Sequence, residues 1–535
     1  NGAFALRACL EQGARAGREA AEAAGFEAKI PELPPLDDVE EAPARAMWLV
    51  PSGRPVQRSK MFVDLQNDVT AGDIQLALGE GYRSIEHVKR YTTTGMGTDQ
   101  GKIANVNALG IVSETTGQPI AAIGVTTFRP PYTPVAFGAI VGRNCGDMFD
   151  PVRRTPMHAW HEAQGAVFED VGQWKRPWYY PRPGEGMAAA VAREVKAART
   201  TIGILDASTL GKIDLQGPDA AELLNRVYTN AWSQLPVGRC RYGLMLGEDG
   251  MVLDDGVTTR LGEHHYLMST TSGGAARVLA WLEEWLQTEW PELKVYCTSV
   301  TEQWATISIS GPDSRKLLAE LAPDLDVLAE AFPHMSMREG RVRGVPARVF
   351  RISFTGELGF EIQVPASHGL SVWEACIEAG AKYGITPYGT EAMHVLRAEK
   401  GYIIAGQDTD GTVTPYDLGM DWIVSKRKPD FIGKRSLARA DMQKPGRKQL
   451  VGLLPELAGE VLEEGAQIVA DPHQSIPMTM IGHVTSSYMS PNLGRSFALA
   501  LLKDGRARIG ERLYVPMLDR TIAVLQAVAD AETDL

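Results

Sequence analysis

The spacing of apolar residues alternates between helical and strand-like patterns along most of the chain. Helical spacing covers residues 2–24, which end before a glycine, and residues 71–79 and 84–91 after a short strand at 61–63. A further amphipathic helix is predicted by five apolar residues at i, i+3, i+4 and i+7 spacing: Val278, Leu279, Leu282, Trp285 and Leu286. Together these segments predict an α+β fold.

Turn residues mark two antiparallel hairpins in the second half of this pattern. Residues 247–250 separate the apolar run 242–246 from 251–260, and residues 355–359 separate 349–354 from 360–364. Beyond residue 446 the pattern becomes short strands, such as 449–453 and 481–486, between glycine and proline turns. We expect a small β-barrel there.

One strand–turn–helix pattern occurs twice, at Ile213–Asp219 and at Ile307–Asp313, each time through Gly-Pro-Asp. Proline suits the first turn of a helix, and aspartate suits the positive end of the helix dipole. The repeat therefore predicts two related α+β halves.

Composition divides the chain further. Residues 26–58 are rich in proline and carry an acidic cluster at 37–41, which indicates an extended linker between the helix of residues 1–25 and a small helical module with its connector at 59–150. Alternating strands and helices fill 151–445, and the barrel pattern fills 446–535. At 535 residues and 44% hydrophobic residues, the chain is long enough for several folded units.

Charge and cysteine usage narrow the function classes. A net charge of -12 argues against nucleic acid as the main partner, and the longest strongly apolar run, Phe497–Leu502, is far below the roughly 18–20 residues of a membrane span. The five cysteines are widely spaced without a CxxC pair, which favours a cytoplasmic setting. Because the first residue is Asn1 and no leader pattern follows it, we expect a processed or truncated start without a secretory signal.

Few residues predict chemistry by themselves. His158 and His161 are three apart, but a polar helix face explains them better than a metal site, so none is assigned. The glycines of residues 95–101 lack the GxGxxG spacing of a nucleotide loop. Asp254 and Asp255 follow a hairpin turn, and strand alternation allows only one of them to face a given pocket.

Six motifs in order resemble the folate-dependent aminomethyltransferase family over residues 154–530. They are Gly203–Ser208 (GILDAS), Leu215–Asp219 (LQGPD), Met251–Asp255 (MVLDD), Phe354–Glu361 (FTGELGFE), Leu396–Gly401 (LRAEKG) and Thr485–Gly494 (TSSYMSPNLG). The resemblance implies a folate-binding domain like that of the glycine-cleavage aminomethyltransferase, followed by its C-terminal β-barrel.

The preceding segments resemble parts of another assembly. Residues 1–6 look like the last helix of a dinucleotide-binding flavoprotein domain whose body is absent, and residues 61–110 look like a ferredoxin-associated module. The cysteines of that module are replaced here by Asp64, Gln66, Asp99 and Ala104, so no iron–sulfur cluster is expected. This order of segments resembles the alpha-subunit family of heterotetrameric sarcosine oxidases.

That resemblance implies an enzyme that oxidises the N-methyl group of sarcosine and passes the one-carbon unit to tetrahydrofolate, giving glycine, 5,10-methylenetetrahydrofolate and H2O2, or formaldehyde without folate. It implies beta, gamma and delta partner subunits, with FAD and FMN mainly on or shared with the beta subunit and NAD possible only in the absent N-terminal region. The alternatives are a subunit of an N-methylglutamate- or dimethylglycine-type dehydrogenase, or a non-catalytic folate-binding scaffold.

The resemblance also implies roles for six residues. Asp255 matches the catalytic aspartate and Glu361 the carboxylate that binds the pterin. Tyr242 matches a tyrosine of the folate site and Arg397 an arginine that could meet the glutamate tail. Two positions depart from the glycine-cleavage enzyme, with Phe354 in place of a tyrosine and Thr270 near a pocket asparagine, so the pterin contacts are expected to differ.

Overall fold

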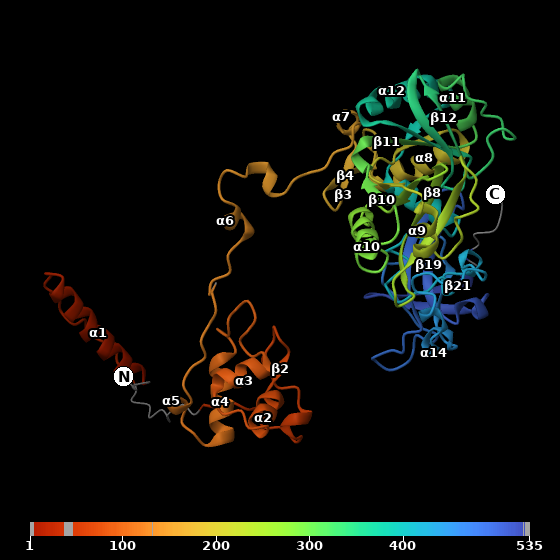
Figure 1. The fold of residues 1–535 in the computed structure, drawn as a ribbon. Coiled ribbons are helices and arrows are strands. Elements are labelled where there is room, and N and C mark those ends of the chain that lie inside the picture. Colours follow the sequence, from red (N-terminus) through yellow and green to blue (C-terminus); the bar gives the residue numbers. More distant parts are fainter. Residues whose placement is uncertain (1–4, 37–45, 131, 528, 530–535) are drawn as a thin grey trace. The chain divides into compact units, whose positions relative to one another are not determined.

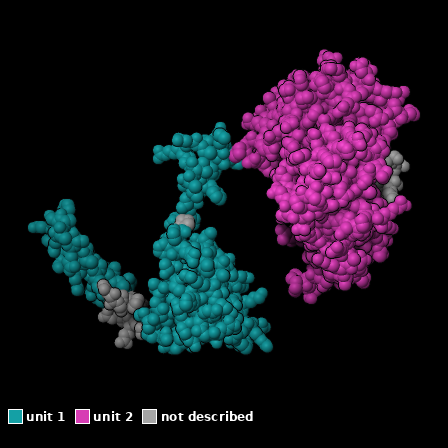
Figure 2. All heavy atoms as spheres, viewed as in Figure 1, with its two compact units in different colours: residues 1–150 teal, residues 151–535 magenta. Residues whose placement is uncertain are grey.

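The computed structural model describes residues 5–36, 46–130, 132–527 and 529, which fall into two compact units, 1–150 and 151–535 (Figures 1 and 2). Helix α1 (Leu6–Ala23) begins the first unit and buries none of its side chains. The predicted helix thus ends two residues before Gly25, which has a φ of +85°. Residues 2–4 of that prediction and the acidic cluster at 37–41 lie outside the described residues.

A small module follows the linker. Its hairpin and three main helices are β1 (Phe62–Asp64), β2 (Val69–Thr70), α2 (Ala71–Gly79), α3 (Ile85–Thr92) and α4 (Asn105–Thr116). Ile74, Val88 and Ile111 meet in one apolar core. Helix α2 begins with a capping box, in which the Thr70 hydroxyl accepts the Asp73 N–H and the Asp73 carboxylate accepts the Thr70 N–H. The connector adds the short helices α5 (Ile120–Ile123) and α6 (Phe137–Val141).

The carboxylate of Asp64 holds the module's loops together. It is buried and accepts the backbone N–H groups of Gln66 at 2.9 Å and Gly95 at 2.7 Å. Burial raises the pKa of Asp64, but these bonds outweigh that effect and leave the pKa below its usual value. The residue that stands where the resembling module has a cysteine is therefore a hydrogen-bond centre.

The second unit begins with a two-sheet part, in which both sheets are mainly antiparallel. The first sheet has the order β10-β6-β9-β8-β7, with β6 (Gly211–Gln216), β7 (Cys240–Leu246), β8 (Val252–Gly262), β9 (His265–Thr270) and β10 (Tyr296–Ser299). The second sheet has the order β12-β13-β14-β11-β5-β15, with β5 (Gly203–Asp206), β11 (Trp304–Ser310), β12 (Ser336–Val342), β13 (Val345–Arg351), β14 (Gly359–Pro365) and the parallel edge strand β15 (Thr386–Pro387). Both predicted hairpins, β7–β8 and β13–β14, are present.

Helices cover the outer face of each sheet, and the inner faces meet (Figure 1). Helices α9 (Ala220–Val227) and α10 (Ala275–Thr288) pack on the first sheet, and α11 (Ser314–Leu321) and α12 (Gly369–Gly380) on the second. The inner faces join in an apolar cluster that contains Cys240 and Leu267 from the first sheet and Met337 and Phe350 from the second. Polar residues on the two inner faces therefore lie in the layer between the sheets.

The repeated Gly-Pro-Asp turn joins β6 to α9 and β11 to α11. Gly217 and Gly311 have φ values of +141° and +131°, and a Cβ there would lie 2.1 Å and 2.3 Å from the carbonyl oxygens of Lys294 and Thr201. Each aspartate is the N-cap, so the proline lies two positions before the first helical residue rather than in the first turn of the helix. The two halves are confirmed as related units because β7-β8-β9-β6 and β12-β13-β14-β11 repeat one strand order.

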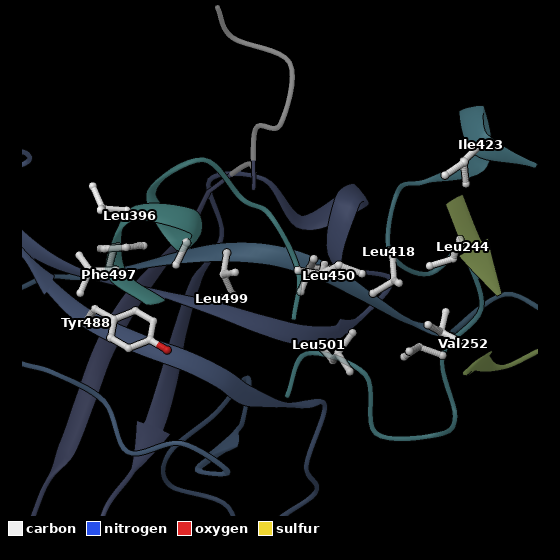
Figure 3. Close-up of a cluster of buried hydrophobic side chains, with 14 of the residues drawn as sticks. Leu244, Val252, Leu396, Leu418, Ile423, Leu450, Tyr488, Phe497, Leu499 and Leu501 are labelled. Atoms are coloured by element: carbon white, nitrogen blue, oxygen red, sulfur yellow. The ribbon is translucent and has the colours of Figure 1, made fainter. Parts of the chain in front are cut away.

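Five further elements complete the part before the barrel: α7 (His158–Ala163), β3 (Val167–Val171), β4 (Trp174–Tyr179), α8 (Met187–Thr200) and α13 (Thr390–Glu399). The short helix α14 (Ala440–Gln443) precedes the barrel sheet. Figure 3 shows the apolar cluster that joins these parts, with Leu244 from β7, Leu396 from α13 and Leu499 from the barrel. One core thus binds the barrel to the two-sheet part.

The barrel sheet has the order β17-β18-β19-β16-β21-β20. Its strands are β16 (Lys448–Pro455), β17 (Gln467–Ile468), β18 (Gly482–Ser490), β19 (Arg495–Lys503), β20 (Arg512–Pro516) and β21 (Thr521–Ala527). Its two edges meet where Val469 and Tyr514 exchange backbone hydrogen bonds of 2.9 and 3.0 Å, so the sheet curls round on itself. Among the described residues, no helix has both the length and the apolar character needed to cross a bilayer.

Candidate functional site

Asp255 and Tyr242 lie on the inner face of the first sheet. In the β7–β8 register Leu244 is opposite Asp255 and Tyr242 is opposite Val257, and residues opposite one another share a face. The Tyr242 hydroxyl donates to Asp255 Oδ2 over 2.6 Å. Burial raises the pKa of Asp255 to about 7, although the bond from Tyr242 lowers it. At neutral pH this carboxyl can therefore exchange a proton.

Asp254 belongs to the opposite face, as strand alternation predicts. Its Oδ1 accepts the backbone N–H of Asp255 over 2.8 Å, and its Oδ2 accepts the Thr271 hydroxyl over 3.1 Å. A Cβ at Gly274 would lie 1.8 Å from the same Oδ2, so this carboxylate packs tightly at the start of α10. The two neighbouring carboxylates thus lie in different environments, and Asp254 links strand β8 to the start of helix α10.

Glu361 lies on the inner face of the second sheet. It is opposite Phe350 in β13 and Ser308 in β11, and Phe350 belongs to the cluster between the sheets. Burial raises the pKa of Glu361 to about 7, against the lowering effect of the Lys212 cation. No hydrogen bond joins this carboxylate to another of the described residues. Its lone pairs are open to a ligand.

The structure therefore brings three of the six predicted residues to the layer between the sheets. Asp255 and Tyr242 belong to the first sheet and Glu361 to the second, and the charge of Glu361 acts on Cys240 of the first sheet across that layer. Carboxyl groups with pKa values near neutrality, desolvated on facing sheets, are typical of a functional site. A polar ring bound between the two sheets could therefore donate hydrogen bonds to a carboxylate on either sheet.

Phe354 and Thr270 lie elsewhere. The Phe354 side chain is 38% exposed after β13, and its ring stacks on Tyr402 with centroids 6.4 Å apart. Thr270 shares its face of β9 with Met268, which packs on the helix side of the first sheet, and its hydroxyl donates to the Thr271 carbonyl over 2.9 Å. The structure does not bring either side chain to Asp255 or Glu361, so their folate contacts stay predictions.

Arg397 is built into the interior. Its side chain is fully buried on α13, where Nη1 contacts Asp408 and the Tyr402 carbonyl, and Nη2 donates to the Ser486 hydroxyl over 2.7 Å. Asp408 also accepts the Thr485 hydroxyl over 2.6 Å. Both terminal nitrogens are occupied by protein acceptors. This network joins α13 to β18, and a contact with a glutamate tail stays a prediction without support from this geometry.

Sequence reasoning missed the polar groups beneath the site. Lys212 in β6 is buried, and its Nζ donates to the Ser208 and Leu210 carbonyls over 2.9 and 3.0 Å. His161 is also buried, with its ring nitrogens 3.1 Å from Asp206 Oδ2 and 2.9 Å from the Tyr180 hydroxyl. The sequence did contain a signal for these groups, because Lys212 and Asp206 each lie beside apolar residues in a strand and a buried charge needs a partner.

The two histidines are not an exposed polar face. His161 is enclosed, and His158 is nearly so, with its Nε2 3.3 Å from Glu162 Oε1. The short helix packs its histidines inward, so the expected polar face of residues 158–161 is wrong. Within the described ranges, no three His, Cys, Asp or Glu side chains gather as metal ligands would.

Known proteins match this chain along almost its whole length. The model of the GCVT N-terminal domain matches residues 157–428, that of the sarcosine oxidase A3 domain residues 58–143, and that of the glycine cleavage T-protein C-terminal barrel domain residues 448–528. The sarcosine oxidase subunit alpha of Corynebacterium sp. (strain P-1) is 55% identical over 98% of this chain and 55% of its own length. The chain spans about half the length of the curated sarcosine oxidase subunits it matches.

Two further comparisons concern the part after the module. The aminomethyltransferase of Thermotoga maritima is 31% identical over 68% of this chain and 93% of its own length. The crystal structure of the glycine cleavage system aminomethyltransferase T from Bartonella henselae matches with a TM-score of 0.61 at 24% identity, over 70% of this chain and 97% of that one, which shows the shared fold. The chain therefore belongs to the glycine cleavage T-protein family and is a relative of the sarcosine oxidase alpha subunits.

Proposed function

We propose that this chain is the folate-binding part of a sarcosine oxidase alpha subunit and transfers the one-carbon unit of oxidised sarcosine to tetrahydrofolate. The observation that carries the proposal is the pair Asp255 and Glu361, two desolvated carboxyl groups on facing sheets with pKa values near 7. The identity to sarcosine oxidase alpha subunits supports the choice of sarcosine. In this proposal residues 151–445 form the folate domain, 446–535 the barrel and 59–150 a structural module without a cluster.

Glu361 anchors the pterin ring. An ionised carboxylate accepts two N–H groups from a planar ring edge, and such charge-assisted bonds are shorter and stronger than neutral ones. The side chain is suited to this because no described residue bonds to its oxygens while Lys212 favours its charged form. Desolvation strengthens the bonds further once water is displaced.

Asp255 acts as the general base. The folate nitrogen attacks the methylene carbon of the iminium derived from sarcosine, and its N–H proton passes to Asp255, which Tyr242 holds in place. The second folate nitrogen then displaces the amine, the carbon–nitrogen bond to the glycine portion breaks, and both N–H protons of the folate end on the glycine amine. The products are 5,10-methylenetetrahydrofolate and glycine.

The oxidation itself belongs to partner chains in this proposal. FAD and FMN on or shared with the beta subunit supply the two-electron chemistry, and oxygen becomes H2O2 there. Gamma and delta subunits complete a cytoplasmic assembly. Without folate, water takes the one-carbon unit and formaldehyde is released.

Calorimetric titration of tetrahydrofolate into the chain tests the site. We expect saturable binding by the wild type and a loss of at least about tenfold, or about 1.4 kcal/mol, in Glu361→Gln, which keeps the shape of the side chain and removes its charge. Glu357→Gln on the nearby turn is the matched control, because Glu357 pairs with Arg199 over 3.0 Å outside the layer between the sheets. A folded wild type that does not bind would contradict the proposal.

A further inference from the structure

Lys212 lies on the inner face of the first sheet. In the β6–β9 register it is opposite Ser269, whose hydroxyl bonds both backbone groups of Val257, so Lys212 shares the inner face with Val257 and Asp255. The chain passes from the second sheet to the first through residues 207–210, and the Lys212 ammonium donates to two carbonyls of that loop. These bonds fix the position of the cation.

The charges of two carboxylates, Glu361 and Asp206, favour the protonated form of Lys212, and Asp206 already has protein partners. Asp206 is fully desolvated, with Oδ2 3.1 Å from His161 Nε2 and Oδ1 accepting the Ser208 N–H over 3.0 Å. Glu361, the second, forms no ion pair within 4 Å among the described residues. The Lys212 charge therefore acts on Glu361 through space, without occupying its lone pairs.

We propose that Lys212 is a positioning residue for the pterin site, which keeps the Glu361 carboxylate ionised while leaving both of its oxygens free for the ring. The inference rests on the proposed folate function and names the group that sustains it. A direct salt bridge would compete with the ligand, whereas a cation tied to the 207–210 loop stabilises the charge at a distance.

The other titratable groups around Glu361 do not replace this cation. Cys240 from β7 and Tyr388 after β15 face it, and burial raises the pKa of each to about 12, so both stay neutral. Arg348, two residues before Phe350 on β13, stacks on Trp304 and pairs with Glu339 over 3.4 Å. Asp255 titrates in the same pH range, but its titration is common to every variant below.

The test is the pH dependence of tetrahydrofolate binding by the full chain between about pH 6 and 8.5. In the wild type, affinity falls as the pH drops through about 7, because protonation removes the charge of Glu361. In Lys212→Met we expect the midpoint to rise by about one pH unit and affinity at pH 7.5 to fall by about threefold. Lys212→Arg should restore the wild-type midpoint.

Lys428→Met is the matched control. Lys428 is also buried and donates to backbone carbonyls, those of Tyr228 and Asn230, but Glu361 is not among the charges that act on it. Its loss should leave the midpoint unchanged. If Lys212→Met does not fold, Lys212→Gln, which keeps a donor for the loop carbonyls, takes its place with the same expected shift.

A double-mutant cycle separates positioning from simple structural damage. Lys212→Met should weaken binding far less in the Glu361→Gln background than alone, because the charge it supports is already gone. Equal weakening in both backgrounds, or an unshifted midpoint in Lys212→Met, would overturn the inference while leaving the folate site intact. No binding by the wild type would instead overturn the proposed function, and the inference with it.

Discussion

At the scale of single residues, neighbouring side chains of one type have opposite environments. Asp254 accepts three hydrogen bonds, one from the Asp255 N–H and two from the N–H and hydroxyl of Thr271, whereas Asp255 accepts one from Tyr242 and lies on the inner face. A carboxylate with that many protein donors is committed to structure, and one beside a single hydroxyl remains available for proton transfer. The difference supports the proposed catalytic role of Asp255 within the pair.

Asp255→Asn should reduce the transfer step by about 10²–10⁴-fold, the usual contribution of a general base, with tetrahydrofolate affinity changed only a few-fold. The measurement is 5,10-methylenetetrahydrofolate formed per sarcosine oxidised in the assembled oxidase. Asp254→Asn serves as the comparison, since it should lower stability rather than the ratio of products. A ratio within threefold of wild type in Asp255→Asn would favour the non-catalytic scaffold.

The pH profile of the transfer step should follow Asp255. Because the base must be ionised and its pKa is raised to about 7, the rate falls as the pH drops through that value. The bond from Tyr242 lowers the pKa, so Tyr242→Phe should move the midpoint to higher pH. Rates measured from pH 6 to 9 in both proteins decide this, and a midpoint that moves downward in the variant would refute the assignment.

At the scale of elements, the Arg397 network joins helix α13 to strand β18 of the barrel. Arg397→Met leaves the Asp408 carboxylate buried without its cation, and we expect a loss of about 3–5 kcal/mol in the free energy of unfolding. The double variant Arg397→Met/Asp408→Leu should recover part of that loss. Urea unfolding measures both. Unchanged stability together with weakened folate binding would support a contact with the glutamate tail instead.

The two repeated turns depend on glycine for space as well as for φ. Gly311→Ala places a methyl group 2.3 Å from the Thr201 carbonyl at a φ of +131°, and we expect it to destabilise the second unit by about 1–3 kcal/mol. Gly344, with a φ of +81° and open space around it, is the control, and its alanine variant should lose less. Equal losses in urea unfolding would show that close approach contributes nothing.

At the scale of the whole molecule, the site belongs to one of the two compact units. All residues of the inner faces lie in 151–535, so a fragment with that range should fold and bind tetrahydrofolate as tightly as the full chain, within about twofold. Circular dichroism and calorimetry on the two proteins test this. A folded fragment that binds at least tenfold more weakly would show that residues 1–150 contribute to the site.

Local patterns predicted much of this fold because they report on single elements. The amphipathic spacing of 278–286 gave α10 with Val278 and Leu282 buried, and the turn residues located both hairpins within a few positions. The end of β13 at Arg351, three residues before the predicted strand end, depended on pairing partners that the run itself does not contain. Helix α4 was missed because the small residues around Gly110 weaken its periodicity.

The sequence alone determined the α+β class, the repeated halves and the opposite faces of Asp254 and Asp255, since each follows from neighbours along the chain. The choice of Asp255 within that pair came from the resemblance to the aminomethyltransferase family. Only the tertiary structure decided that Asp255, Glu361 and Lys212 face one layer and that Arg397 is enclosed. Those facts depend on which sheet faces meet, and packing between segments far apart in sequence leaves no local signal. Burial then sets the pKa values on which the proposed chemistry depends.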